Sequence, residues 1–353
     1  MADQMTSRPA GLQEDHRNRT RGDAGAAPSR RSILAAAVPG ALAAVGLLAG
    51  CGETGVANGA SDPKASSSGR RSPSPSHSPS PSPTPKPPPE LPRGGRTLFP
   101  AHRLFGYCGL PGAAALGRLG TGDPEQRADE IEERAHAYSG GRTALPVFEL
   151  LACVADASPG PDGTYRTRTP DDTIGRFHEL ARKHRAMLLL NIQPGRASVL
   201  DEVKALHDWL VHPDVGVALD PEWEMGPGQV PGNTYGYTDG GELNSVAHYL
   251  SGLIDDHHLP EKPLVFHEVA TSVVGDRGSL RPHPGVVPIM SADGIGSPGL
   301  KRATWHRLVR NMPDGLHTGF KLFYDEDTRG GTGLMSPKDV LALRPQPEYV
   351  MYE

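Results

Sequence analysis

The sequence predicts one (β/α)8 barrel that follows a long non-globular leader. Composition changes sharply near residue 95. Before it Ala, Ser, Pro and Arg dominate and aromatic residues are almost absent, whereas apolar clusters and polar stretches alternate after it. About 260 residues remain, enough to bury one substantial core. Within them roughly eight apolar strand-like runs alternate with amphipathic helical stretches, as expected for a barrel of buried parallel strands.

The elements of this barrel follow one another along the chain. The expected strands are 104–108, 145–154, 186–192, 215–219, 263–266, 286–290, 319–324 and 349–352. The expected helices are 124–138, a helix from Thr169-Pro170-Asp171 to His184, 199–211, 242–257, 300–311, and one from Ser336 to Leu343, with only a weak helix after 263–266. A doubly wound open sheet is the main alternative, but no glycine-rich phosphate turn follows the first strand.

The first fifty residues have the order of a secretory signal. Arg30 and Arg31 precede a weakly hydrophobic Ala/Gly/Leu segment that runs to Gly50, and the pair resembles the bacterial twin-arginine signal. Leu48-Ala49-Gly50-Cys51 resembles the lipobox of bacterial lipoproteins, which implies cleavage of residues 1–50 and diacylation of Cys51. We therefore expect a lipid anchor on the extracytoplasmic face of the cell membrane. A plain transmembrane anchor is the alternative.

Residues 51–95 form a Pro/Ser-rich spacer between the lipidated cysteine and the barrel domain, residues 96–353. Such a segment cannot bury enough apolar surface to offset its ordering entropy, and its prolines favour extended polyproline II. At roughly 3.1 Å per residue it reaches on the order of 120 Å. The spacer is therefore expected to be a disordered tether; the alternative is a ligand for proline-reading domains.

Composition and motifs exclude several functional classes. The net charge is -5 and no dense Lys/Arg stripe lies in the folded part, so nucleic acid is not an expected partner. His257-His258 and His267-Glu268 lack the spacing of metal ligands, and no Gly-x-Ser-x-Gly elbow occurs. No metal or other cofactor is predicted. A polysaccharide or small-molecule ligand remains open, and the sequence does not indicate an oligomeric state.

Polar residues gather where the predicted strands end. Active sites of such barrels lie at the carboxyl ends of the strands, so residues distant in sequence meet at one mouth. We therefore expect ligand contacts from Glu149, Asn191, Gln193, His267, Glu268, Asp293, Tyr324 and Asp325. The run Asp325-Glu326-Asp327 either extends this acidic mouth or forms a solvated turn.

Three carboxylates follow the fourth strand at a spacing of two: Asp220, Glu222 and Glu224. In an extended chain they point to the same side. Crowded carboxylates raise one another's pKa, which makes one of them a general acid at neutral pH while another supplies charge or nucleophilicity. These are the expected catalytic residues of a glycosidase-type reaction.

The same segment carries a family resemblance. Asp220-x-Glu222-Trp223-Glu224 resembles the acidic fourth-strand motif of chitinase-like glycosidases, which implies that Glu224 is the proton donor. Asp220 and Glu222 also resemble the Asp-x-Glu of barrel-fold bacterial lysozymes. The chitinase motif begins with aspartate where this chain has Val217, and its middle aspartate is Glu222 here.

Over most of its length the chain resembles a group of actinobacterial cell-surface lipoproteins without an assigned reaction. The lipobox, the Pro/Ser spacer and the ALDPEW, GFKLFYDED and LALRP segments carry this likeness. Two functions follow as hypotheses. One is a surface-anchored glycosidase or transglycosylase, and the other is a lipoprotein that binds a glycan or small ligand without turnover.

Aromatic residues and cysteines leave two further alternatives open. Tyr235 and Tyr237, in the long 225–241 connection, and Trp223 either stack on sugar faces or pack the loop onto the barrel rim. Cys108 and Cys153 fall late in neighbouring strands. They either form a disulfide in an oxidising exterior or remain buried thiols.

Overall fold

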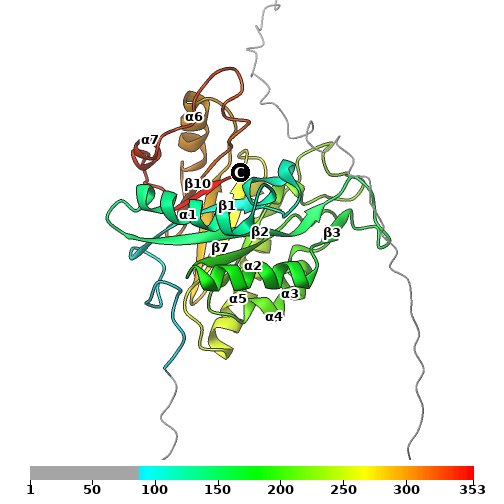
Figure 1. Cartoon of the computed structure of the whole chain (residues 1–353). Coiled ribbons are helices and arrows are strands. Elements are labelled where there is room, and N and C mark those ends of the chain that lie inside the picture. The colour runs from blue at the N-terminus through cyan, green and yellow to red at the C-terminus, as the bar shows by residue number, and fades with distance from the viewer. Residues whose placement is uncertain (1–86) are drawn as a thin grey trace, which may run out of the picture.

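The computed structural model describes residues 87–353, which form a closed barrel of eight parallel strands (Figure 1). Cys51, the signal and most of the spacer lie outside the described residues. The barrel strands are β1 (His102–Gly109), β2 (Thr143–Ala155), β4 (Met187–Ile192), β5 (Val215–Leu219), β7 (Lys262–Glu268), β9 (Val286–Ala292), β10 (His317–Leu322) and β11 (Tyr349–Tyr352). All eight coincide with the runs expected from sequence.

Closure of the barrel distinguishes it from an open sheet. The strands follow the order β1, β2, β4, β5, β7, β9, β10, β11, and β1 pairs in parallel with both β2 and β11. Leu104, for example, is in register with Leu145 on one side and Tyr349 on the other. The (β/α)8 prediction is therefore confirmed, and the doubly wound alternative is wrong.

Helices cover the outside of this barrel, with α2 to α5 on one side and α6 and α7 on another (Figure 1). Their bounds are α1 (Pro124–Tyr138), α2 (Asp171–Lys183), α3 (Val199–Ala205), α4 (His207–Leu210), α5 (Gly240–Asp256), α6 (Pro298–Leu308) and α7 (Pro337–Leu341). Their starts carry local signals: the Asp123 side chain caps α1, and Ser336 and Asp339 form a capping box at α7. The helix expected over 199–211 is divided at Leu206 into α3 and α4.

Several short elements lie outside the regular strand–helix alternation. β3 (Arg166–Arg168) pairs antiparallel with the end of β2, and β6 (Thr238–Asp239) pairs with β8 (Val274–Gly275). The position after β7, where only a weak helix was expected, holds β8 and the 3-10 turn η5 (Arg277–Ser279) instead of an α-helix. These elements are too short for a hydrophobic period to predict them.

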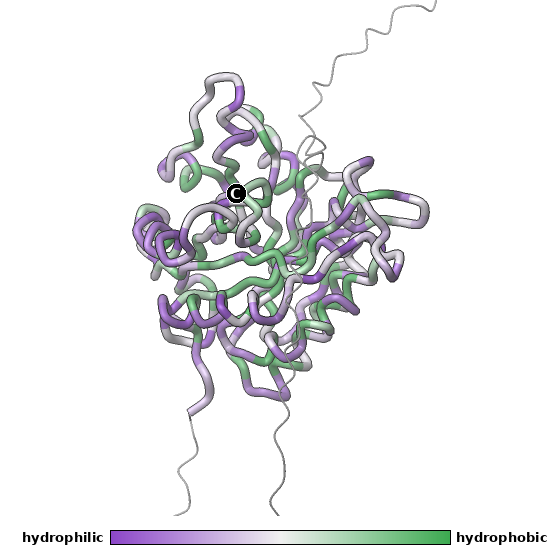
Figure 2. The backbone as a smooth tube through the Cα atoms, turned by 45° about the vertical axis from the view of Figure 1, so that its right-hand side comes forward, coloured by the Kyte–Doolittle hydropathy of each residue, from purple (hydrophilic) through white to green (hydrophobic). Residues whose placement is uncertain are grey.

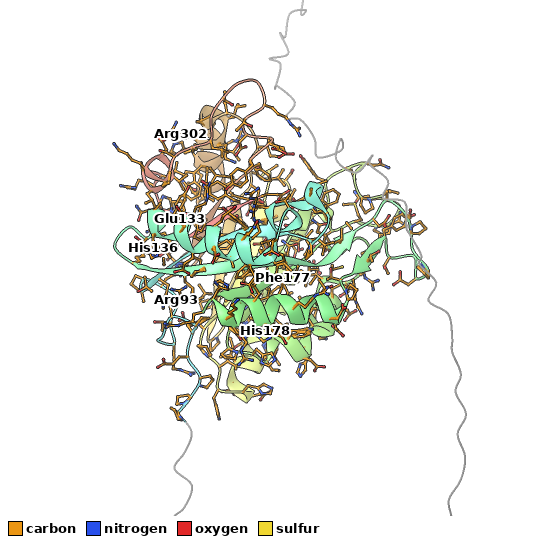
Figure 3. The ribbon with its side chains drawn as sticks, in the orientation of Figure 1. Arg93, Glu133, His136, Phe177, His178 and Arg302 are labelled. Carbon is orange, nitrogen blue, oxygen red and sulfur yellow. The ribbon has the colours of Figure 1, made fainter. Side chains whose placement is uncertain are left out.

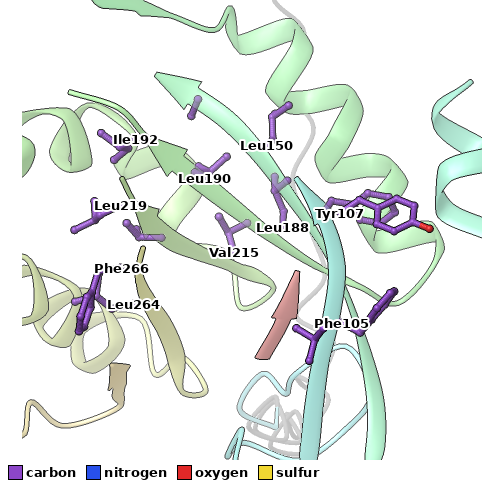
Figure 4. Packing of buried hydrophobic residues seen from close by; sticks show 14 of the residues in the cluster. Phe105, Tyr107, Leu150, Leu188, Leu190, Ile192, Val215, Leu219, Leu264 and Phe266 are labelled. Carbon is purple, nitrogen blue, oxygen red and sulfur yellow. The ribbon is translucent and has the colours of Figure 1, made fainter. Parts of the chain in front are cut away.

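The alternating side chains of the strands divide the apolar core into two clusters. One fills the barrel interior below the carboxyl ends of the strands and includes Leu104, Val147 and Leu189. The other lies between strands and helices and includes Phe105, Leu150 and Phe266; Figure 4 shows part of it. Because both faces of the strands are buried, the strands are apolar along most of their length, as the hydropathy colouring of Figure 2 shows.

The segment before β1 closes the amino-terminal end of the barrel. Leu91 and Leu98 are buried with the interior cluster, and Arg93, labelled in Figure 3, pairs with Glu132 of α1. The folded unit thus includes Leu91, which precedes the boundary expected at residue 96. Among residues 87–353, no helix combines the length and apolarity needed to cross a bilayer.

Candidate functional site

The upper interior of the barrel, at the carboxyl ends of the strands, is polar. The apolar interior positions of each strand give way there to buried polar side chains, because alternate residues of one strand share a face. The structure brings together Glu149, Asn191, Gln193, Asp220, His267 and Asp293 from the expected set. Residues that are distant in the sequence thus lie together at the carboxyl ends of the strands, as expected for a barrel.

Two carboxylates, Glu149 and Asp220, are bridged by one amide. Asn191 Nδ2 donates to Glu149 Oε1 at 2.9 Å and to Asp220 Oδ1 at 3.3 Å. Gln193 Nε2 donates to the other oxygen, Asp220 Oδ2, at 2.9 Å, while Gln193 Oε1 accepts the Ala155 N–H. Both carboxylates are buried. The amides therefore hold a close pair of carboxylates in a fixed orientation.

His267 lies beneath this pair, between Glu149 and a third carboxylate. Its Nδ1 is 2.9 Å from Asp293 Oδ2, and its Nε2 makes an ion-pair contact of 3.1 Å with Glu149 Oε1. Burial alone lowers the pKa of His267, but the charges of Asp293 and Glu149 outweigh burial and raise it well above its ordinary value. Burial correspondingly disfavours ionised Glu149, yet His267 and Lys321 hold its pKa below the usual range. The pair is thus an imidazolium and a carboxylate at neutral pH.

Lys321, Glu353 and Tyr349 complete the mouth, although sequence reasoning did not propose them. Lys321 Nζ lies 2.7 Å from Glu353 Oε2 and 3.4 Å from Asp293 Oδ2, and the Tyr349 hydroxyl donates to Glu149. A Cβ at Gly319 would lie 2.6 Å from the Tyr349 ring, so glycine leaves the space for this ring. Lys321 had a recognisable signal, a charged residue inside an apolar strand.

A small cavity of about 40 Å³ opens among these groups, enough for a few water molecules. Its charged and amide lining is Glu149, Asn191, Gln193, Asp220, Lys321 and Glu353, with Cys108, Trp223 and the 3-10 turn η2 (Ala114–Leu116) on its other sides. Within residues 87–353, Trp223 Nε1 has no hydrogen-bond acceptor and Asn191 Oδ1 has no donor. Both residues line the cavity, and a buried polar atom without a partner in the protein is the kind of group that a water molecule or a ligand satisfies.

A second, open pocket of about 360 Å³ adjoins the cavity. Ala115 and Glu353 line both, so η2 and the end of the chain separate an inner from an outer compartment. Tyr324 and Asp325 line the outer pocket, not the inner cavity. Tyr324 lies edge-on to Tyr107, with its hydroxyl 3.3 Å from that of Tyr107.

The acidic segment after β5 does not have the geometry expected from sequence. Pro221–Trp223 forms the 3-10 helix η4, because the proline ring fixes a φ that suits a turn, so the chain is not extended there. The expectation that all three carboxylates share one face is therefore wrong. Asp220 lines the inner cavity, whereas the buried Glu222 and the half-buried Glu224 do not. Glu224 lies instead beside Glu242 and Thr238, at the start of α5.

The Glu224 environment predicts a specific pH dependence of stability. Burial and the neighbouring Glu242 carboxyl raise the pKa of Glu224 to about 9. In the unfolded chain it titrates near 4.3, so between about pH 4.3 and 9 only the unfolded state loses this proton and stability falls as pH rises. Glu224→Gln mimics the protonated form. We expect it to stabilise the protein by about 2 kcal/mol at pH 8, allowing for partial exposure, and not at all at pH 4.

Urea unfolding at pH 4, 6 and 8 measures this effect. Glu133→Gln, on the exposed face of α1 (Figure 3), is the matched control and should show no pH-dependent difference from the parent protein. An equal effect of Glu224→Gln at all three pH values would contradict the assigned pKa.

Three other predicted contact residues lie away from the cavity. Glu268, the last residue of β7, points to the outer side of the barrel wall, where Arg277 Nη1 lies 3.4 Å from it and burial raises its pKa to about 7. Tyr235 and Tyr237 are 41% and 52% exposed. A Cβ at Gly275 would collide with the Tyr237 ring, so this ring packs on β8 as the loop-packing alternative describes.

Cys108 and Cys153 are free, buried thiols. Cys108 belongs to the cluster inside the barrel and Cys153 to the cluster between strands and helices, so they lie on opposite faces of the wall. The disulfide alternative is therefore wrong. Sequence position could not reveal this, because a register shift between Leu151 and Cys153 in β2 changes the face that Cys153 occupies.

Comparisons with known proteins assign this chain to no family. No protein-family model and no curated protein matches it. Among solved structures, it is similar to the spore cortex-lytic enzyme SleL of Bacillus megaterium QM B1551, with 10% sequence identity and a TM-score of 0.32. The match covers 67% of this chain and 56% of that one, so the chain spans little more than half of the SleL structure. A likeness this distant carries no information about the mouth's chemistry.

Proposed function

We propose that the barrel mouth binds a saccharide and hydrolyses a glycosidic bond with the carboxylates Asp220 and Glu149. The observation that carries this proposal is the single amide of Asn191 bonded to both carboxylates beside a cavity. Glycosidases need two carboxyl groups that flank the scissile bond. The unsatisfied Trp223 donor and Asn191 acceptor suit hydroxyl groups, which both donate and accept.

The two carboxylates differ in role. Glu149 is held ionised by His267, so it supplies negative charge to an oxocarbenium-like transition state. Asp220, which Asn191 and Gln193 orient beside Trp223 and the cavity, exchanges the proton with the leaving oxygen and with water. Since one oxygen of each carboxylate lies within 3.3 Å of the same nitrogen, these oxygens are closer than the separation of about 6.5 Å typical of inverting enzymes. The arrangement favours retention.

The anchor predicted from sequence determines which substrates this site would meet. Lipid on Cys51 and the 52–95 spacer would hold the barrel outside the cell membrane within reach of the wall. The motif and composition of the leader support this part of the proposal, as does the likeness to actinobacterial surface lipoproteins. We therefore propose a cell-wall or environmental polysaccharide as substrate.

Incubation of the purified protein with peptidoglycan, chitin and actinobacterial wall polysaccharides tests this function. Mass spectrometry of the soluble fraction should detect released fragments, and neither Asp220→Asn nor Glu149→Gln should release them. Glu222→Gln and Glu224→Gln separate this assignment from the motif-based one. If these two abolish release while the mouth variants do not, the reaction uses the acidic motif and the proposed pair is wrong.

A binding role without turnover is the second candidate, and two observations favour it. The inner cavity of about 40 Å³ is smaller than a sugar ring, and both oxygens of Asp220 already accept amide hydrogen bonds, which fix this carboxyl as an acceptor for a ligand. A glycan that binds the parent protein and both mouth variants, with no product from any substrate, would establish this role instead of hydrolysis.

A further inference from the structure

Resting on the proposed saccharide site, we infer that the mouth selects sugars that carry a protonated amine over N-acetylated and acidic sugars. The inference starts from the charges that line the inner cavity. Three carboxylates line it, Glu149, Asp220 and Glu353, against one ammonium, Lys321. Uncompensated charge in a buried site is unfavourable, so a ligand that brings positive charge gains the most there.

The cations near the cavity are already engaged by carboxylates. Lys321 lies between Glu353 and Asp293, and His267 lies between Asp293 and Glu149. A uronate, sulfate or phosphate group on the ligand would therefore have to compete with an existing buried ion pair. It would also face the remaining carboxylate charge, which repels it.

The unsatisfied acceptor of Asn191 also calls for a donor. Its Nδ2 is committed to the carboxylates of Glu149 and Asp220, which in the ionised form only accept hydrogen bonds, so the orientation of the amide is fixed. Oδ1, in a side chain that is 1% exposed, is left without a donor among the described residues. An ammonium offers three donors and can reach a carbonyl oxygen and a carboxylate together, whereas an N-acetyl group offers one.

The outer compartment also favours a positively charged ligand over an acidic one. Its arginines are paired, Arg118 with Glu130 at 3.0 Å and Arg329 with Glu326 at 3.2 Å. Asp325 lines the same pocket, is exposed, and makes no ion pair within the described part of the chain. A second amine on the adjacent sugar would therefore meet a carboxylate there as well.

A metal ion would also neutralise the carboxylates that line the cavity, but the residues there suit an ammonium group better. In residues 87–353 no group of three or more His, Cys, Asp and Glu side chains is arranged to hold one. The nearest partners of Asp220, Asn191 Nδ2 and Gln193 Nε2, are amide donors, which cannot ligate a cation. The geometry thus favours an ammonium group.

Isothermal titration calorimetry of the purified full-length protein at pH 6 tests the inference. Its ligands are the β-1,4 tetramers of glucosamine and of N-acetylglucosamine, tetragalacturonate, hexalysine, and Mg²⁺ or Ca²⁺ alone. We expect the glucosamine tetramer to bind at least tenfold more tightly than any other. Asp325→Asn should weaken glucosamine binding severalfold and leave binding of the N-acetylated tetramer unchanged. If hexalysine binds as tightly as the glucosamine tetramer, the attraction is non-specific and the inference is overturned. Tighter binding of the N-acetylated or the acidic tetramer than of the glucosamine tetramer would also overturn it.

Measurement of reducing ends on the same tetramers separates this inference from the proposed hydrolysis. Preferred binding of glucosamine without cleavage of any tetramer supports the amine selectivity and contradicts hydrolysis. Cleavage confined to the N-acetylated tetramer supports hydrolysis and contradicts the selectivity. Cleavage with preferred glucosamine binding supports both, and a metal ion that binds more tightly than every tetramer contradicts the selectivity.

Discussion

Replacement of Asp220 by asparagine is expected to lower the rate of glycoside cleavage by about 10²–10⁴-fold, the usual contribution of a positioned proton-transfer group. Asparagine keeps the size of the side chain but cannot exchange the proton. It also puts an amide donor opposite the donors of Asn191 and Gln193, which costs about 1–3 kcal/mol of stability. Initial rates on the polysaccharide that the parent protein cleaves measure the effect.

Two comparisons separate lost chemistry from lost folding. Asp129→Asn makes the same change on the exposed face of α1 and should cleave at the parent rate. Circular dichroism and the melting temperature show whether Asp220→Asn is folded under assay conditions. A folded Asp220→Asn protein that retains more than a tenth of the parent rate would exclude Asp220 as the proton-transfer residue.

Replacement of His267 by glutamine is expected to destabilise the fold by about 3–5 kcal/mol, because it leaves Glu149 and Asp293 buried without their shared cation. For a domain of this size the melting temperature should fall on the order of 10 °C. The raised pKa of His267 makes its contribution greatest below about pH 6.5, the unfolded value, and the contribution declines as pH rises through the folded value.

Urea unfolding at pH 6 measures this loss, with the exposed His257→Gln as the matched control, which should change stability by less than about 0.5 kcal/mol. The double variant His267→Gln/Glu149→Gln should recover part of the loss, because it removes one of the unpaired charges. If His267→Gln unfolds within 1 kcal/mol of the parent, the buried imidazolium is not what neutralises these carboxylates.

The mouth is therefore a preorganised part of the barrel whose buried charges cost stability. Its charges are held by partners from five strands, so each carries a stability cost as well as a chemical use. That combination is typical of sites where burial and charge are arranged for function.

The amino-acid sequence by itself determined the order and type of the barrel elements. Buried strands such as 186–192 and 215–219 are apolar on both faces, and α1 carries a capping aspartate and a first-turn proline. These are local signals, so eight strands and most helices could be predicted, and with them the end of the barrel where polar groups gather. Glu149, Asn191, Gln193 and Asp220 followed from that placement alone.

Only the tertiary structure decided which of the predicted residues meet. A proline turned the chain after Asp220 into a 3-10 helix and carried Glu224 to Glu242, a partner that lies far along the chain. Lys321 and Glu353 lie in the mouth because β10 and β11 stand between β9 and β1 in the closed barrel. Cys108 and Cys153 lie on opposite faces of the barrel wall and are therefore apart. Barrel closure, the turn after Asp220 and the register shift between Leu151 and Cys153 in β2 depend on packing between elements, and no local pattern in the sequence records them.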